Sequence, residues 1–248
     1  MIKIDIISGF LGAGKTTLIK KLVSESLQGV KLAIIENEFG EIGIDSGFLK
    51  SSGVEIKELD SGCICCSLVG DFETSLKEVV ETYHPERIII EPSGVGKLSD
   101  VAKAVGAVQS EINGVLNNKI VVVDVTKCKI YSKNFGEFFI DQVVSADTII
   151  LSRMDKASDK KIKESIALLT ELNSTATIIT TPITDLSGEV LLESIDNKPD
   201  LLNQLIKEVS HHEHHHEHGE SCGCGHEHHE HHHEHGESCG CGHEHHEH

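Results

Sequence analysis

The chain has 248 residues and a formal charge of −18 at pH 7, from 22 Lys and Arg against 40 Asp and Glu. A chain this acidic repels nucleic acid and anionic membrane surfaces, so neither is an expected partner. No stretch approaches the 18 apolar residues of a membrane span, and the first residues lack the basic-then-apolar pattern of a secretory signal. These features are typical of a soluble cytoplasmic protein.

The charge and the rarer residues are unevenly distributed. Residues 211–248 hold 17 of the 18 His, nine Glu and four of the eight Cys, with no Lys, Arg or aliphatic residue. This tail and residues 1–210 therefore carry −9 each when His is neutral. A 17-residue unit, HHHEHGESCGCGHEHHE, occupies 214–230 and again 231–247. Because no apolar side chain offsets the entropy of ordering, we expect 211–248 to be disordered.

Residues 1–196 are predicted to form one domain, which the linker 197–210 joins to the tail. Short apolar, β-branched runs alternate there with longer helix-permissive segments. The runs predict strands at Ile2–Ile7, Lys31–Glu36, Arg87–Ile90, Lys119–Asp124, Thr148–Leu151 and Thr175–Thr180. The segments between them predict helices at Gly14–Leu27, Asp71–Tyr83, Leu98–Val108, Asn134–Val144, Ser158–Leu172 and Leu186–Ile195. The alternation predicts an α/β fold with a doubly wound, mainly parallel sheet.

The segment GFLGAGKTT (9–17) separates the first predicted strand from the first predicted helix. It matches the phosphate-loop pattern GxxxxGK[ST] in the structural context that this pattern needs. Glycines let backbone N–H groups surround phosphate oxygens, the lysine reaches the β- and γ-phosphates, and the first threonine hydroxyl binds Mg²⁺. The sequence therefore predicts a nucleoside-triphosphate site formed by Gly9, Gly12, Ala13, Gly14, Lys15, Thr16 and Thr17.

Two acidic segments follow predicted strands. Glu91 ends an apolar run and precedes Pro92-Ser93-Gly94, where a carboxylate suits Mg²⁺ and the attacking water. We assign catalytic roles to Lys15, Glu91 and Gly94, the last as a backbone donor to the γ-phosphate. The acids of ENEFGEIGID (36–45) suit a loop that meets Mg²⁺ when the γ-phosphate is present, although a solvated loop explains them equally well.

Three cysteines, Cys63, Cys65 and Cys66, lie within four positions. In a reducing cytosol this spacing favours a metal or redox site over a disulfide. Three sulfurs supply most of a tetrahedral shell for Zn²⁺, Co²⁺ or Cu⁺ and leave one position open, which suits a metal that is handed on. Buried cysteines and a redox switch are the alternatives. The isolated Cys128 is interpreted as a packing residue, and His84 as a surface or capping residue.

Together these segments resemble the CobW-related metallochaperone GTPases. The resemblance rests on GFLGAGKTT (9–17), ENEFGEIGID (36–45), GCICC (62–66) and EPSG (91–94), and it covers nearly all of 1–196. It implies GTP and Mg²⁺ at Lys15 and Thr16, with Glu38 or Glu91 near the ion. It also implies that Cys63, Cys65 and Cys66 bind a transition metal for delivery to a client apo-metalloprotein.

Two features depart from the family pattern. The guanine-specifying segment, usually Asn-Lys-x-Asp, reads Ser152-Arg153-Met154-Asp155. Asp155 can still accept from guanine N1–H and N2–H₂, so GTP stays favoured over ATP, with weakened affinity or selectivity. Many relatives carry a β-rich C-terminal domain where this chain has its tail. We expect the imidazoles and thiolates of that tail to bind transition metals, the thiolates being Cys222, Cys224, Cys239 and Cys241.

We therefore expect a GTP-hydrolysing metallochaperone that carries Zn²⁺, with Co²⁺ and Ni²⁺ as the other candidate metals. The alternative is a metal buffer in which the tail binds the metal and nucleotide turnover is incidental. A small-molecule kinase would leave the cysteines unexplained. The sequence leaves the oligomeric state open between a monomer and a homodimer.

Overall fold

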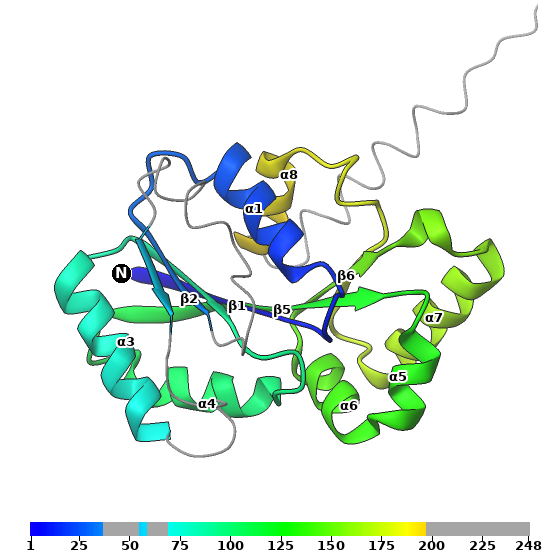
Figure 1. Ribbon diagram of the computed structural model, residues 1–248, viewed down its shortest axis with the longest axis horizontal. Helices are drawn as coiled ribbons and strands as arrows, with labels where there is room; N and C mark the ends of the chain where they lie inside the picture. Colours follow the sequence, from blue (N-terminus) through cyan, green and yellow to red (C-terminus); the bar gives the residue numbers. More distant parts are fainter. Residues whose placement is uncertain (37–54, 59–68, 197–248) are drawn as a thin grey trace, which may run out of the picture.

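The computed structural model describes residues 1–36, 55–58 and 69–196, with side chains for 1–36 and 72–196 (Figure 1). Seven parallel strands form one sheet in the order β3-β2-β4-β1-β5-β6-β7. The strands are β1 (Ile2–Ser8), β2 (Leu32–Glu36), β3 (Glu55–Glu58), β4 (Arg87–Glu91), β5 (Gly114–Asp124), β6 (Thr148–Ser152) and β7 (Thr177–Ile179).

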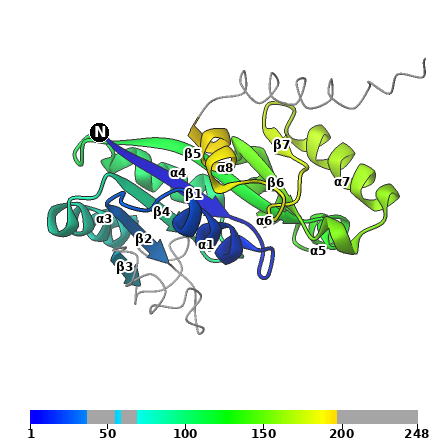
Figure 2. The same ribbon diagram turned by 90° about the horizontal axis from the view of Figure 1, so that it is seen from above.

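Helices cover both faces of this sheet (Figures 1 and 2). On one face lie α1 (Lys15–Glu25) and α8 (Gly188–Asp196). On the other lie α3 (Val69–Tyr83), α4 (Leu98–Val108), α5 (Cys128–Asn134), α6 (Gly136–Ser145) and α7 (Asp159–Leu172). A short 3₁₀ helix, η1 (Met154–Lys156), follows β6. The predicted doubly wound α/β fold is therefore confirmed, in a sheet whose described strands all run parallel.

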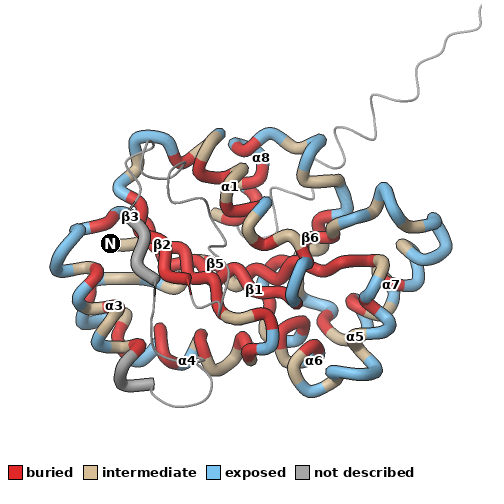
Figure 3. The backbone as a smooth tube through the Cα atoms, viewed as in Figure 1, coloured by how far each residue is buried: buried red, intermediate tan, exposed pale blue. Residues whose placement is uncertain are grey.

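Strand β4 shows how the apolar runs produce this arrangement. Successive side chains of a strand point to opposite faces, so Ile88 and Ile90 join the core beneath α3–α7 while Ile89 joins the core beneath α1 and α8. All five residues of β4 are buried, and Figure 3 shows buried backbone throughout the middle of the sheet. A strand between two helical layers needs no polar face, which explains the uninterrupted apolar run.

Besides the short η1, which was not predicted, the structure differs from the sequence prediction mainly at three elements. The unpredicted β3 is a charged four-residue strand, EIKE, at the edge of the sheet, where charged residues are common. The unpredicted α5 precedes α6, which begins at Gly136 instead of Asn134. Strand β5 begins at Gly114 instead of Lys119, because residues 114–118, which read GVLNN, also pair with β1.

A buried charge cluster fixes the end of α8 to the amino-terminal ends of the strands. Arg87 donates to Asp5 (2.6 Å) and to Asp196 (2.6 and 3.2 Å), and Lys3 and Asn117 also donate to Asp196. Burial raises the pKa of Asp5, against the attraction of Arg87. Burial also acts to raise the pKa of Asp196, but hydrogen bonds from Arg87 and Lys3 outweigh it and lower that pKa.

Within the described residues, no helix is long and apolar enough to cross a membrane. Several predicted features lie outside them: the cysteines Cys63, Cys65 and Cys66, the residue Glu38, the linker, and the tail with its predicted disorder.

Candidate nucleotide site

The phosphate loop joins β1 to α1 at the carboxyl edge of the sheet. Gly9, Gly12 and Gly14 all have positive φ, at 140°, 70° and 108°. A Cβ on Gly9 would lie 2.4 Å from the carbonyl oxygen of Val122 on β5, so only glycine allows this approach. The loop therefore lies against the sheet and leads directly into α1, whose first N–H groups form an anion-binding end.

Lys15, the first residue of α1, is 4% exposed, and its Nζ lies 3.7 Å from Oε1 of Glu91, which is 3% exposed. The sheet register places Glu36, at the end of β2, beside Glu91 at the end of β4. Glu36 is also buried. No role was assigned to Glu36 individually from the sequence. Its position at the end of a predicted strand, like that of Glu91, could have indicated that it belongs to the site. Two carboxylates and a lysine thus gather beside the glycine loop.

The segment after β4 packs directly on the phosphate loop. A Cβ on Gly94 would lie 2.7 Å from the backbone nitrogen of Leu11, so glycine is required here for close contact. The buried Gln142 of α6 donates from Nε2 to the carbonyl oxygens of Gly94 (3.3 Å) and Gly96 (2.9 Å). Gln142 therefore holds the predicted catalytic segment in place. No sequence motif marks it, because its partners are 46 and 48 positions away.

Phe10 anchors the same loop to the helical layer. Its ring stacks on Tyr131 of α5 with centroids 4.6 Å apart, and it also contacts Phe135 and Phe139. Phe10 is buried, so the side chain that follows the first glycine of the motif belongs to the core beneath α5 and α6. Such aromatic contacts contribute about 0.5–1.5 kcal/mol each beyond burial.

The predicted base-recognition segment also contacts the loop. The Ser152 hydroxyl donates to the Ala13 carbonyl oxygen at 2.6 Å, and Arg153 donates from Nη2 to the Gly12 carbonyl oxygen at 2.8 Å. The Nε atom of Arg153 lies 3.2 Å from Oδ2 of the buried Asp124. Arg153 has φ 56°, an uncommon left-handed conformation for a non-glycine residue, so these contacts hold a strained backbone.

A cleft of about 250 Å³ opens beside these contacts. It is bounded by Ala13, Gly14 and Thr17 of the loop, by 151–155, and by 182–184 after β7. Asp155 lines it and is exposed. Sequence reasoning missed Pro182, Ile183 and Thr184, although a segment that follows a parallel strand at the carboxyl edge is a general place for ligand contacts.

The remaining described candidates lie away from this cleft. Cys128 is fully buried, and burial raises the pKa of its thiol, which confirms it as a packing residue. His84 is exposed, with φ 47°, and its N–H donates to Val80 at the end of α3, which confirms it as a surface capping residue. The described residues hold no cluster of three or more His, Cys, Asp or Glu able to bind a metal ion.

Replacing Arg153 with alanine should weaken nucleotide binding about tenfold, because hydrogen bonds to charged groups contribute roughly 1.5–3 kcal/mol and this side chain is partly exposed. Titration with a fluorescent nucleotide measures the effect. Lys156→Ala, at an exposed position of η1, is the matched control and should leave affinity unchanged. Equal affinity in both variants would contradict a tethering role for Arg153.

A glycine loop before a helix, a buried lysine and glutamates at strand ends, all at the carboxyl edge of a doubly wound parallel sheet, define a P-loop nucleotide-binding protein. A family model described as the CobW/HypB/UreG nucleotide-binding domain matches residues 3–180. The chain belongs to this family.

Individual relatives agree with this assignment. The zinc chaperone CobW of a Sinorhizobium species is 31% identical over 250 positions, covering 87% of this chain and 68% of the relative. The zinc chaperone YeiR of Escherichia coli is 32% identical over 158 positions, covering 64% and 48%. The Zn(II)-bound YjiA GTPase of E. coli has the same fold, with a TM-score of 0.56 and 24% identity over 75% of this chain and 58% of that one. This chain spans about half to two thirds of the length of these relatives.

Proposed function

We propose that this protein is a GTP-hydrolysing metallochaperone that carries zinc under nucleotide control. The buried pair of Lys15 and Glu91 beside the glycine loop, with Glu36 aligned next to Glu91, supports the nucleotide chemistry of this function. Lys15 can turn toward the β- and γ-phosphates, where its charge offsets the negative charge of the transition state. Gly94 lies against the loop, so its backbone N–H is a suitable donor to the γ-phosphate.

The donor set around this pair also fits Mg²⁺, a hard cation that prefers oxygen ligands. Thr16 and Glu91 would hold the ion, and Glu36, aligned with Glu91 in the sheet, would add a second carboxylate. Glu38 remains a proposed ligand from sequence alone. When bound, Mg²⁺ neutralises charge on the phosphate oxygens. The chain itself would contribute the glycine loop, whose positive φ angles at Gly9, Gly12 and Gly14 suit a backbone that turns its N–H groups toward phosphate oxygens.

The cleft beside Asp155 is the proposed base site, with Ala13, Gly14 and Thr17 beneath the nucleoside. Asp155→Asn tests the base directly, because asparagine can accept from N1–H and donate to the 2-carbonyl of xanthine, but cannot accept from N1–H and the 2-amino group of guanine at the same time. We expect the variant to lose about 10–100-fold in GTP affinity, the value of a bidentate pair, and to gain affinity for XTP. Competition binding with GTP, XTP and ATP gives the three affinities.

Asp159→Asn, an exposed aspartate at the start of α7, is the control for this experiment and should leave the preference unchanged. An Asp155→Asn variant that keeps its GTP preference would contradict guanine recognition at this cleft. Tighter binding of ATP than GTP by the unmodified chain would contradict a GTPase.

The metal is proposed to bind Cys63, Cys65 and Cys66. Thiolate ligands and an open fourth position suit Zn²⁺, and relatives of this chain are named zinc chaperones. Cys63 follows Glu58, the last residue of β3, by five residues, which is at most about 17 Å of extended chain. Glu58 is in register with Glu36 at the carboxyl edge of the sheet. Chain length alone therefore ties the cysteines to the nucleotide edge, which supports coupling between the two sites.

The proposed recipient of the metal is a client apo-metalloprotein. We propose that 1–196 is the GTPase domain, 197–210 a linker and 211–248 a metal-binding tail. A second candidate function, a metal buffer with incidental nucleotide turnover, is favoured by the 17 His and four Cys of that tail. The two differ in one respect: only a chaperone requires metal at Cys63, Cys65 and Cys66 to change nucleotide affinity.

A further inference from the structure

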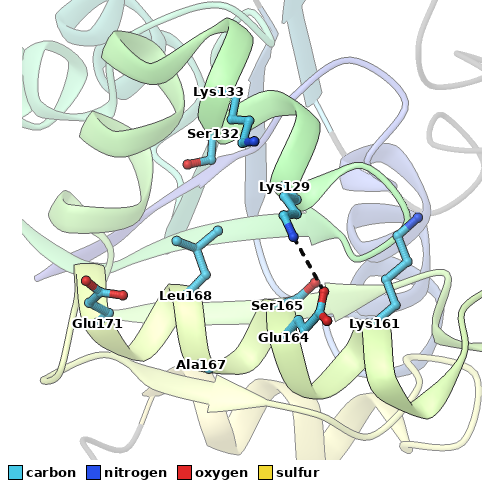
Figure 4. A pocket seen from close by; sticks show the side chains of 9 residues that line it. All are labelled: Lys129, Ser132, Lys133, Lys161, Glu164, Ser165, Ala167, Leu168 and Glu171. Atoms are coloured by element: carbon cyan, nitrogen blue, oxygen red, sulfur yellow. Dashed lines mark ion pairs between the residues drawn. The ribbon is translucent and has the colours of Figure 1, made fainter. Parts of the chain in front are cut away.

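A groove of about 430 Å³ lies between α5 and α7, away from the nucleotide cleft. Figure 4 shows Lys129 and Lys133 of α5 on one side and Lys161, Glu164 and Glu171 of α7 on the other, with Leu168 between the two helices. Nζ of Lys129 lies 3.8 Å from Oε2 of Glu164. Among the described residues, Lys133 and Lys161 have no acidic partner within 4 Å. We call this feature the basic groove.

The surroundings of the basic groove are also positive. Residues 127–134 contain three lysines and no acid, and residues 160–163 contain three more lysines. These lysines are all exposed. Six lysines therefore outnumber the three acids beside them, Asp159, Glu164 and Glu171. In a chain with a formal charge of −18, this local excess of positive charge favours contact with a flexible anionic segment.

The same chain supplies such a segment. Residues 211–248 contain nine glutamates and no Lys or Arg, so their charge is −9 at neutral pH. The linker 197–210 begins directly after α8 and spans up to about 48 Å when extended, whereas a domain of this size has a diameter of roughly 40 Å. A tethered segment has an effective concentration in the millimolar range, so several weak ion pairs are sufficient for docking.

We propose that the glutamates of 211–248 dock in the basic groove of the same chain. A divalent metal ion bound by neutral imidazoles adds two positive charges to the tail, whereas one bound by two thiols displaces two protons and leaves the charge unchanged. Metal loading at the histidines therefore weakens this docking. The metal-free tail is therefore held against α5 and α7, and the loaded tail is released toward a partner. This surface and its occupant are separate from the nucleotide cleft and from Cys63, Cys65 and Cys66.

A zero-length carbodiimide cross-linker, which joins lysine amines to carboxylates in contact, tests the proposal on the full-length protein. The tail has no Lys or Arg, so trypsin releases 208–248 as one fragment whose cross-links are read by mass spectrometry. We expect cross-links from the tail to Lys129, Lys133 and Lys161 at about 20 mM salt, falling at least fivefold at about 1 M salt, where charges are screened beyond about 3 Å.

Lys103 on α4 provides the matched control, because its side chain is similarly exposed (77%, against 69% for Lys129). Each of the two lysines also has one acidic neighbour: Nζ of Lys103 lies 3.6 Å from Oδ1 of Asp100, and Nζ of Lys129 lies 3.8 Å from Oε2 of Glu164. The double variant Lys133→Glu, Lys161→Glu should lower cross-linking at Lys129 at least fivefold, whereas Lys103→Glu should not. Equal cross-linking at Lys103 and Lys129, or yields that salt leaves unchanged, would overturn the proposal. In a mixture of ¹⁴N and ¹⁵N protein, cross-links mainly between chains would also overturn it, because the occupant would be the tail of a second copy.

Discussion

Lys15→Met should lower kcat for GTP hydrolysis by about 10²–10³-fold, the usual cost of losing one preorganised charge at a transition state. Methionine keeps the length and apolar stem of lysine but removes the ammonium group that lies 3.7 Å from Glu91. Lys15 is buried at the first position of α1, so the variant removes a charge that the fold holds in place. Phosphate release measured at saturating GTP gives the effect on kcat.

Lys20→Met, on the same helix, is the control for this prediction and should keep near-normal turnover. Thermal unfolding of both variants separates a loss of charge from a loss of fold. A Lys15→Met protein that is folded, binds GTP and hydrolyses it at the unmodified rate would contradict the assignment of the catalytic lysine.

Arg87→Ala should destabilise the fold by about 3–5 kcal/mol, because it leaves the buried carboxylate of Asp5 without its guanidinium partner. For a domain of this size, that loss lowers Tm by roughly 6–20 °C. Asp196 would also lose two hydrogen bonds, so the end of α8 would be less firmly held. Urea unfolding followed by circular dichroism gives the free energy of unfolding.

The double variant Asp5→Leu, Arg87→Met should lose much less stability than Arg87→Ala, because it removes both charges and leaves apolar side chains of similar size. Lys103→Ala, at an exposed ion pair, should change stability by less than about 1 kcal/mol. An Arg87→Ala variant within about 1 kcal/mol of the unmodified protein would show that the buried cluster contributes little to stability.

The core strands were predictable from sequence, whereas the edge strand β3 and the additional helix α5 were not. Ile88, Ile89 and Ile90 are apolar because both faces of β4 are covered, so the run itself indicates a central strand. Strand β3 has the sequence EIKE, which is equally typical of a solvated loop. Only its pairing with β2 defines this segment as a strand. The local sequence therefore predicts strands that are buried on both faces. It misses a strand that is defined only by its pairing with a neighbouring strand.

The same distinction applies to the nucleotide site. The phosphate loop is predictable because its glycines and lysine act within nine consecutive residues. The contacts of Ser152 and Arg153 with that loop join residues about 140 positions apart, and Gln142 reaches its partners across 46 or more. Ser152 in place of the usual asparagine still makes a polar contact with the loop, which only its distance from the Ala13 carbonyl oxygen reveals.

Zinc and nucleotide must influence each other's binding if the protein is a nucleotide-controlled chaperone. The most direct measurement is the affinity of a non-hydrolysable GTP analogue, with and without Zn²⁺, for the full-length protein and for the triple variant Cys63→Ser, Cys65→Ser, Cys66→Ser. Both proteins keep the tail, so any difference between them comes from these cysteines. We predict that Zn²⁺ changes the affinity of the unmodified protein for the analogue about 5–150-fold and leaves that of the triple variant unchanged. The same affinity with and without Zn²⁺ in the unmodified protein, or the same change in both proteins, would contradict it.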